Sequence, residues 1–313
     1  MKKFIPLIIL LLSITYANEY VEQLKDARQK VTNNYLDFLK SVDNYLSNDY
    51  TEYYGHNDYD NTIYKKNKLL AILSLKAVEY EGFKPSLYLK TKIILPKTKD
   101  KIELTLDKFT DDTTDNKNID DDFDNNMRDS KINIGLSYYL KKSENFNIYA
   151  KLGARLHPPF NIYGRLNAKK NIFLNNTRLT LEQNIYYYIH KQGFIPSVSI
   201  NIIYPVKNDK FILQEKHQLI WREKQDEIEL ENFLRLHQVV NNKNRFAYTL
   251  SYSAINDDEC SFCTHYYSFD IKYHRKITDW FFIDTIPQIG WKRENNFHSA
   301  YSFIFNIGML FGR

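Results

Sequence analysis

Large apolar side chains occupy every second position in the last stretch of the chain. They are Tyr301, Phe303, Phe305, Ile307, Met309 and Phe311, and mostly small or polar residues lie between them. A period of two places all six on one face of a β-strand, whereas a helix would scatter them around its circumference. The pattern predicts a strand from His298 to Phe311 with one apolar, outward face. Its other face carries Ser302, Asn306 and Gly308, which are predicted to leave local space inside.

The same alternation recurs from Lys68 to the C-terminus. The predicted strands span about 68–76, 87–95, 102–106, 132–140, 146–156, 162–168, 176–189, 194–204, 210–222, 227–240, 245–255, 265–275, 280–292 and 298–311. This gives about fourteen strands, or twelve if two weak segments pair elsewhere. The segment Phe211–Trp221 fits worst, because Glu215 and His217 share one possible outward face while Lys216 lies on the other.

A different period precedes the strands. Apolar residues recur at three- and four-residue spacing in Val21, Leu24, Ala27, Val31, Tyr35, Leu39, Val42 and Leu46. This spacing predicts one amphipathic helix over 18–48, whose apolar stripe must be buried somewhere. A plug in the lumen, a site at the periplasmic mouth and a dimer contact are the alternatives. An Asn-, Asp- and Tyr-rich linker over 49–66 then leads into the domain 67–313.

The first 17 residues have the pattern of a secretory signal. Lys2 and Lys3 precede an apolar run from Phe4 to Leu12, and a small-residue stretch ends at Ala17. The apolar run is shorter than the roughly 20 residues that a spanning helix needs. We therefore predict a cleaved signal peptide over 1–17, with a retained anchor as the alternative.

The repeated two-faced segments favour an all-β, transmembrane, antiparallel up-and-down β-barrel. Half-buried strands of a soluble sandwich also alternate. However, large apolar groups here repeat on one face of nearly every segment, and the chain is rich in Tyr (25) and Phe (20) with only 9 Gly. The mean hydropathy of −0.53 does not oppose this, since barrel strands carry only alternate apolar residues.

The C-terminal alternation resembles the insertion signal of bacterial outer-membrane β-barrels. That family usually ends on the aromatic residue, whereas this chain adds Gly312 and Arg313 after Phe311. The chain also resembles uncharacterised proteobacterial outer-membrane proteins in which a leader helix precedes a barrel. The resemblance implies the cell outer membrane as location, with outer-membrane lipid and the barrel-assembly machinery as partners.

Connection lengths support the strand assignment. Such barrels have short periplasmic turns and longer extracellular loops. With a periplasmic C-terminus, the connections 277–279, 241–244, 206–209, 142–145 and 97–100 fall on the periplasmic side, and all are short. The long connection 110–130 and the predicted loop 256–264 fall outside.

The face opposite the apolar one is predicted to line the lumen, and its charges are mainly basic. The candidate lumen-lining residues are Lys90, Lys92, Lys151, Arg155, Arg165, Lys169, Arg178, Glu182, Glu229, Glu231, Arg235, Asp270, Lys272, Asp284 and Lys292. Charges at membrane depth persist only against water or opposite charge. The lumen is therefore either a wet channel that favours anions or a salt-bridged interior that conducts little.

Two predicted extracellular loops carry other candidate chemistry. The loop 110–130 holds eight Asp residues, but it lacks the glycine and the closing Glu of a calcium loop, so a solvated loop is the simpler interpretation. Cys260 and Cys263 are the only cysteines, and in an oxidising compartment they are expected to form a local disulfide. Neighbouring Asp257, Asp258, Glu259 and His265 leave a metal site as the alternative, although we expect no metal and no cofactor.

The sequence predicts a channel or transporter for small, possibly anionic, solutes. A structural or adhesive barrel with a closed lumen is the first alternative, and an outer-membrane lipid hydrolase is the second. The hydrolase would need a Ser beside a His that is itself oriented by Asn or an acid. No single strand carries such a pair at neighbouring positions of one face, and a pair across two strands stays the open alternative. We therefore expect no enzyme. The formal charge of +5 is too mild to indicate nucleic acid as a partner.

Overall fold

The computed structural model describes one α-helix, two short 3-10 helices and fourteen strands. The described residues are 18–47, 67–79, 82–94, 101–109, 131–143, 145–155, 160–189, 193–207, 210–257 and 260–312. The predicted signal peptide 1–17, the linker 49–66 and the acidic loop 110–130 lie outside the described residues.

The strands follow one another along the chain. They are β1 (Lys68–Val78), β2 (Gly82–Ile94), β3 (Ile102–Phe109), β4 (Lys131–Lys142), β5 (Phe146–Arg155), β6 (Asn161–Leu174), β7 (Thr177–Tyr188), β8 (Gly193–Lys207), β9 (Phe211–Arg222), β10 (Glu227–Val239), β11 (Asn244–Asp257), β12 (Cys260–Lys276), β13 (Phe281–Lys292) and β14 (Ser299–Phe311). The helix is α2 (Asn18–Ser47), and η3 (Glu223–Gln225) and η4 (Arg293–Asn295) are the 3-10 helices.

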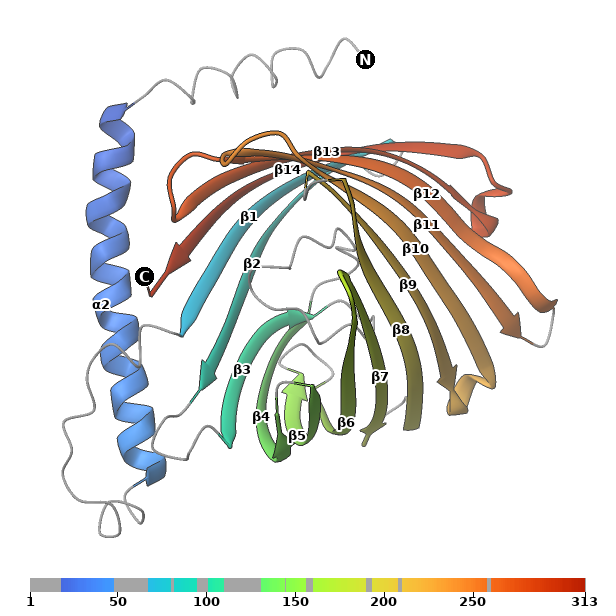
Figure 1. Ribbon diagram of the computed structural model, residues 1–313, viewed down its shortest axis with the longest axis horizontal. Helices are drawn as coiled ribbons and strands as arrows, with labels where there is room; N and C mark the ends of the chain where they lie inside the picture. Colours follow the sequence, from blue (N-terminus) through green and yellow to red (C-terminus); the bar gives the residue numbers. More distant parts are fainter. Residues whose placement is uncertain are drawn as a thin grey trace. The chain divides into compact units, whose positions relative to one another are not determined.

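Each strand pairs with its neighbours in chain order, and β1 pairs with β14 to close the barrel (Figure 1). Where β1 meets β14, the backbone N–H of Glu79 donates to the carbonyl of Tyr301 at 2.9 Å. The predicted fold class is confirmed, with fourteen strands rather than twelve. We call the end with connections 143–145, 175–176 and 240–243 the turn end, and the other the opposite end.

The two faces of each strand differ as the period of two requires. In β6, Tyr163, Arg165 and Asn167 are buried on the inner face, whereas Ile162 and Leu166 are exposed on the outer face. The strand register gives the neighbouring strands the same inward and outward faces, because directly paired residues share a face. In this part of the wall, polar and tyrosine side chains therefore line the inside, and aliphatic side chains cover the outside.

The outer face forms an apolar belt. Leu152 is 65% exposed and Leu166 is 52% exposed, and similar side chains follow on the neighbouring strands, among them Val198, Leu219 and Leu250. Such a continuous apolar surface is unfavourable in water but is the surface that a membrane barrel presents to lipid. The outer face is thus built for contact with hydrocarbon.

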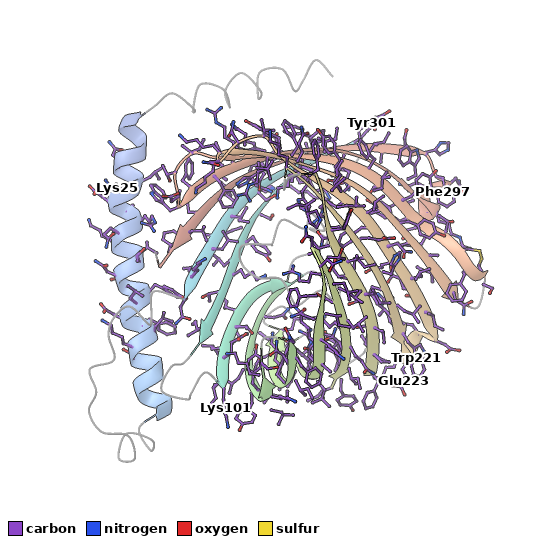
Figure 2. The ribbon with its side chains drawn as sticks, viewed as in Figure 1. Lys25, Lys101, Trp221, Glu223, Phe297 and Tyr301 are labelled. Carbon is purple, nitrogen blue, oxygen red and sulfur yellow. A yellow bond between two sulfur atoms is a disulfide. The ribbon has the colours of Figure 1, made fainter. Side chains whose placement is uncertain are left out.

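Aromatic side chains gather at both ends of this belt. At the opposite end, the rings of Tyr187 and Phe194 lie 4.8 Å apart, and those of Tyr267 and Trp291 also lie 4.8 Å apart. At the turn end, the rings of Phe246 and Tyr273 are 5.0 Å apart. Figure 2 labels Trp221, Phe297 and Tyr301, which lie in or near the ends of β9 and β14 at the opposite end. Two aromatic bands are typical of membrane–water interfaces.

Strand β9, which the sequence could not orient, has Glu215 and His217 on the outside. Gln218 and Ile220 are buried on its inner face, and Lys216 shares that face. The register confirms the orientation, because inward Ser199 pairs with Gln218. Two polar residues therefore lie within the apolar belt.

The prediction of a loop over 256–264 is wrong. Strand β11 runs to Asp257 and β12 begins at Cys260, so most of the segment is paired strand. The pairing shifts between Ser253 and Ala254 and again before Asp257, and Phe262 has a φ of 51°. These irregularities broke the alternation that would have revealed the strands in the sequence.

The space predicted beside Gly308 is filled. A Cβ at Gly308 would overlap the ring of Phe282 on β13. Similarly, a Cβ at Gly153 would overlap the ring of Tyr163 on β6. At both places a ring from the adjacent strand covers the glycine, an arrangement known to stabilise glycine in sheets.

The final strand has its six apolar residues on the predicted face, but their exposure is uneven. Tyr301 is 57% exposed, whereas Phe305 is 3% exposed. Asn306 and Gly308 lie on the inner face, where Asn306 pairs with buried Asp284 of β13. The role of this strand as an insertion signal stays a prediction.

Helix α2 occupies the predicted range. Its exposed side chains interact locally, as when the Gln29 amide donates to Asn33 Oδ1 at 3.1 Å. Among the described residues, no helix has the length and apolar character needed to cross a membrane. The placement of the helix as a plug, a periplasmic element or a dimer contact stays a prediction.

Candidate functional site

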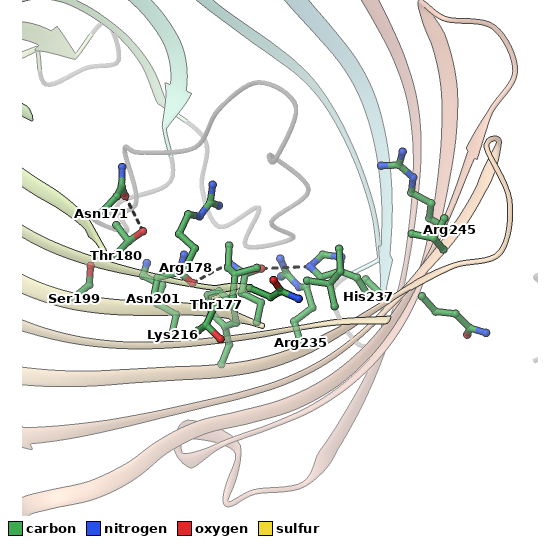
Figure 3. Close-up of a pocket in the computed structure, with 18 of the residues that line it drawn as sticks. Asn171, Thr177, Arg178, Thr180, Ser199, Asn201, Lys216, Arg235, His237 and Arg245 are labelled. Carbon is green, nitrogen blue, oxygen red and sulfur yellow. Dashed lines mark hydrogen bonds between the residues drawn. The ribbon is translucent and has the colours of Figure 1, made fainter. Parts of the chain in front are cut away.

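A cavity of about 600 Å³ lies on the inner side of the barrel wall and is lined by residues of β6 to β12 (Figure 3). It lies toward the turn end, because its lining includes Asn175 and Asn176, which connect β6 to β7, and Arg245 at the start of β11. Asn175 has a φ of 52°, which a tight two-residue hairpin connection requires. The short turn thereby brings both strand ends to the rim of the cavity.

The lining of the cavity is strongly basic. Its Lys and Arg residues are Lys169, Arg178, Lys216, Arg235, Arg245 and Lys272. His237 and His274 also line it, while Glu182 is the one carboxylate among the described lining residues. Among the described lining residues, basic side chains therefore outnumber acidic ones.

Neutral polar side chains hold the wall in a defined arrangement. The Gln214 amide donates to Asn201 Oδ1 at 3.1 Å, and Gln214 Oε1 lies 3.3 Å from His237 Nε2. On the other side, Thr180 Oγ1 donates to Asn171 Oδ1 at 3.0 Å. These contacts are dashed in Figure 3 and link residues of adjacent strands. They provide hydrogen-bonding groups beside the cations.

Some of the cations at the wall are held by partners. Arg235 Nε donates to Thr249 Oγ1 at 3.1 Å. Lys272 Nζ lies 3.4 Å from Asp284 Oδ2, and His274 Nδ1 lies 2.8 Å from the other oxygen of Asp284. The single carboxylate of Asp284 is thus shared by two basic side chains.

A second part of the interior is packed rather than open. At its centre, Arg165 donates from Nε and Nη2 to Asn184 Oδ1, at 2.9 and 2.6 Å. Its Nη2 also lies 3.4 Å from Glu182 Oε1. The guanidinium stacks over the rings of Tyr149 and Tyr186, whose centroids are 5.4 and 4.9 Å away. Charge-assisted hydrogen bonds and cation–π contacts therefore enclose this charge.

Tyrosine rings extend this packed region toward the opposite end. Tyr163, Tyr186 and Tyr188 form a buried cluster with Ile195 and Ile220. The rings of Tyr186 and Tyr188 are stacked 6.0 Å apart. The guanidinium of neighbouring Arg155 lies 5.1 Å from the centroid of the Tyr188 ring. We call this set, with Arg165 and its partners, the packed region.

The predicted lumen residues fall into several settings. Lys169, Arg178, Glu182, Arg235 and Lys272 line the cavity, and Arg155 and Arg165 belong to the packed region. Lys151, Glu229, Asp270 and Asp284 are buried, while Lys90, Glu231 and Lys292 are half-buried. The side chain of Lys92 lies outside the described residues.

Several residues of the interior were not among the predicted ones. Lys216 and Arg222 were missed because β9 could not be oriented from its sequence. Arg222 pairs with Glu227 and, at 2.6 Å, with Glu229. Arg245 lies at an inward position of β11, and its spacing from Ala247 and Thr249 could have revealed it.

The cysteine pair lies apart from the cavity. Cys260 and Cys263 form a disulfide within the first residues of β12. The predicted metal alternative involved Asp257, Asp258, Glu259 and His265, of which Asp258 and Glu259 lie outside the described residues. Within the described part of the chain, no group of three or more His, Cys, Asp or Glu side chains is arranged to hold a metal ion.

A closed barrel with an even number of antiparallel strands, an apolar belt and two aromatic bands is a bacterial outer-membrane protein. No protein-family model and no curated protein matches the chain. Among solved structures it is similar to OmpT, an outer membrane protein of Vibrio cholerae, at 9% identity over 78% of this chain and 96% of that chain, with a TM-score of 0.45.

Two further similarities are to channels. The CymD monoaromatic hydrocarbon channel is 10% identical over 78% of this chain and 87% of that chain, with a TM-score of 0.47. The NanC porin is 8% identical over 76% of this chain and 98% of that chain, with a TM-score of 0.40. These similarities transfer no solute to this chain.

Proposed function

We propose that the protein is an outer-membrane channel for small anionic solutes. The observation that carries the proposal is the cavity of about 600 Å³, with six Lys and Arg residues and one carboxylate in its described lining. A volume of this order accommodates a small solute. Basic side chains at a water-filled pore favour anions over cations, because an anion gains electrostatic attraction that offsets its lost hydration.

The proposal assigns different tasks to the lining residues. Arg178 and Arg245 lie near the turn end, where an anion enters or leaves the cavity. Arg235 and Lys272, deeper on the wall, are fixed by Thr249 and Asp284. Amides such as Gln214 and Asn201 supply hydrogen bonds to a solute that the cations attract.

A barrel with a closed lumen is the second candidate. The packed region favours it, because Tyr163, Tyr186 and Tyr188 fill part of the interior near the opposite end. Such a barrel would serve as a structural or adhesive protein. The two candidates differ in one measurable property, which is the flow of ions.

Conductance across planar lipid bilayers tests the proposal. We expect stable single-channel steps from the full-length protein, with a reversal potential in a KCl gradient that indicates anion preference. A variant that lacks residues 18–47 distinguishes a lumen blocked by the helix from a lumen closed by the barrel itself. If the helix blocks the lumen, its removal raises the conductance. Absence of conductance in both proteins, when both are folded as barrels, would contradict the channel and favour the closed barrel.

A further inference from the structure

A polar cluster interrupts the apolar belt on the outer face of β9 and β10. His217 Nδ1 lies 2.6 Å from Asn232 Oδ1, and His217 Nε2 lies 2.9 Å from Glu215 Oε1. The register pairs His217 directly with Asn232, and Glu215 lies two residues away on the same face of β9. The inward residue Gln218 of β9 is buried, which fixes this trio on the outside.

The cluster lies at the depth of the hydrocarbon. On the outer face of β9, Phe211 lies at the turn end and Trp221 at the opposite end, with Glu215 and His217 between them. Their partners on β8 are Ile202 and Ile200. These aliphatic neighbours show that the cluster is surrounded by the belt rather than by an aromatic band.

Lipid is a poor environment for these groups. The side chains of Glu215 and His217 are 44% and 46% exposed, so their mutual hydrogen bond leaves about half of each in contact with the surroundings. Ionisable groups on the lipid face of a barrel destabilise it, most strongly near the midplane. An ionisable residue at this depth therefore requires a functional partner or a protein surface.

Catalysis on lipid does not account for the cluster. A His-based hydrolase needs a hydroxyl or thiol within hydrogen-bond reach of the imidazole. Both ring nitrogens of His217 already face Asn232 and Glu215. Among the described outward residues of β8, β9 and β10 there is no Ser, Thr or Cys.

We propose that Glu215, His217 and Asn232 form the centre of an interface between two copies of this chain. The cluster is complementary to itself, since it carries both an acid and a base that can bear opposite charges. A two-fold axis along the membrane normal keeps both copies in the same orientation and brings the two clusters to the same depth. Glu215 of one copy then lies within side-chain reach of His217 of the other.

The surroundings of the cluster suit such a contact. Leu219 and Leu234 flank it and are 45% and 41% exposed, and exposed Val198 and Ile200 extend the surface onto β8. Aliphatic surface gains little by leaving lipid, so polar contacts between the copies supply specificity and attraction. Pairing of the clusters brings the half-exposed polar side chains of Glu215 and His217 against polar groups of the other copy instead of lipid.

Oligomeric state tests the interface. We expect wild-type protein to be dimeric by light scattering in mild detergent and by chemical crosslinking in native membranes. The triple variant Glu215→Leu, His217→Leu, Asn232→Leu has a more apolar belt and is expected to fold but to dimerise at least about tenfold more weakly. The matched control Thr285→Leu, an outward residue of β13 three strands away from β10, is expected to remain dimeric.

Charge exchange tests direct contact between the copies. Glu215→Lys alone and His217→Glu alone each place like charges at the interface, so each is expected to be monomeric. Mixed together with different tags, they are expected to copurify, because the Glu215→Lys copy faces carboxylates of the other. A heat-dependent shift in gel mobility checks that every variant is a folded barrel. Three results would each overturn the proposal. They are a monomeric wild-type protein in both detergent and native membranes, a triple-leucine variant that is still dimeric, and folded charge-exchange variants that do not copurify.

Discussion

The surroundings of charged side chains differ between two regions of the barrel interior. In the packed region, Arg165 is enclosed by amides, a carboxylate and two tyrosine rings. At the cavity, Lys216 and Arg245 line the wall beside four other cations. The same inward period of two produced both regions. An inward charge is thus enclosed in packed side chains or placed at the cavity wall, depending on what its cross-strand neighbours supply.

Removal of Arg165 should have the largest effect on stability. Arg165→Ala leaves Asn184 and Glu182 without this partner and removes the cation between Tyr149 and Tyr186. Loss of one partner of a buried ion pair costs about 3–5 kcal/mol. Urea unfolding from lipid vesicles, followed by gel mobility, should show this loss. Glu182→Gln keeps an acceptor for Arg165 and should cost less; an Arg165→Ala barrel as stable as wild type would refute the importance of the packed region.

A methyl group at Gly153 should disturb the same region. Its Cβ would overlap the ring of Tyr163, which must then shift within the tyrosine cluster. Overpacking of this kind costs about 1–3 kcal/mol. The control is Gly164→Ala, because its Cβ meets no atom within 4 Å. Equal unfolding midpoints for the two variants would show that the packing of the Tyr163 ring does not require glycine at position 153.

Replacement of Arg245 should have the smallest effect on stability. Arg245 is exposed on the inner face of β11, so Arg245→Ala should change the free energy of unfolding by no more than about 0.5 kcal/mol. The same vesicle assay measures this change. A loss as large as that of Arg165→Ala would show that the cavity cations are structural, and the distinction between the two regions would fail.

The fold could be read from the sequence because one local property determines it. In β5 and β6 the alternation of apolar and polar residues identifies each strand, its faces and its place in a barrel. In β9 the same rule failed, since Glu215 and His217 are polar on the outer face. In β12 it failed because a register shift and the positive φ of Phe262 interrupt the period.

The site could be read only in part. The period identified Arg178 and Lys272 as inward residues, but it could not separate the cavity from the packed region. That separation depends on which side chains meet across strands, as when the Tyr186 ring of β7 covers Arg165 of β6. Likewise, the small residue Gly308 led to the prediction of local space in the lumen, but the ring of Phe282 from β13 fills this space. Side-chain volume on a neighbouring strand is not encoded in the local pattern.

Ion selectivity after charge reversal tests the central claim most directly. The variant Arg178→Glu, Lys216→Glu, Arg245→Glu replaces three of the six cations of the cavity and leaves Arg165 and its partners in place. In a KCl gradient across a planar bilayer, we predict an anion-selective reversal potential for the wild type and a potential of opposite sign for the variant. Selectivity that is the same in both folded proteins would contradict the assignment of the cavity as the path of the solute.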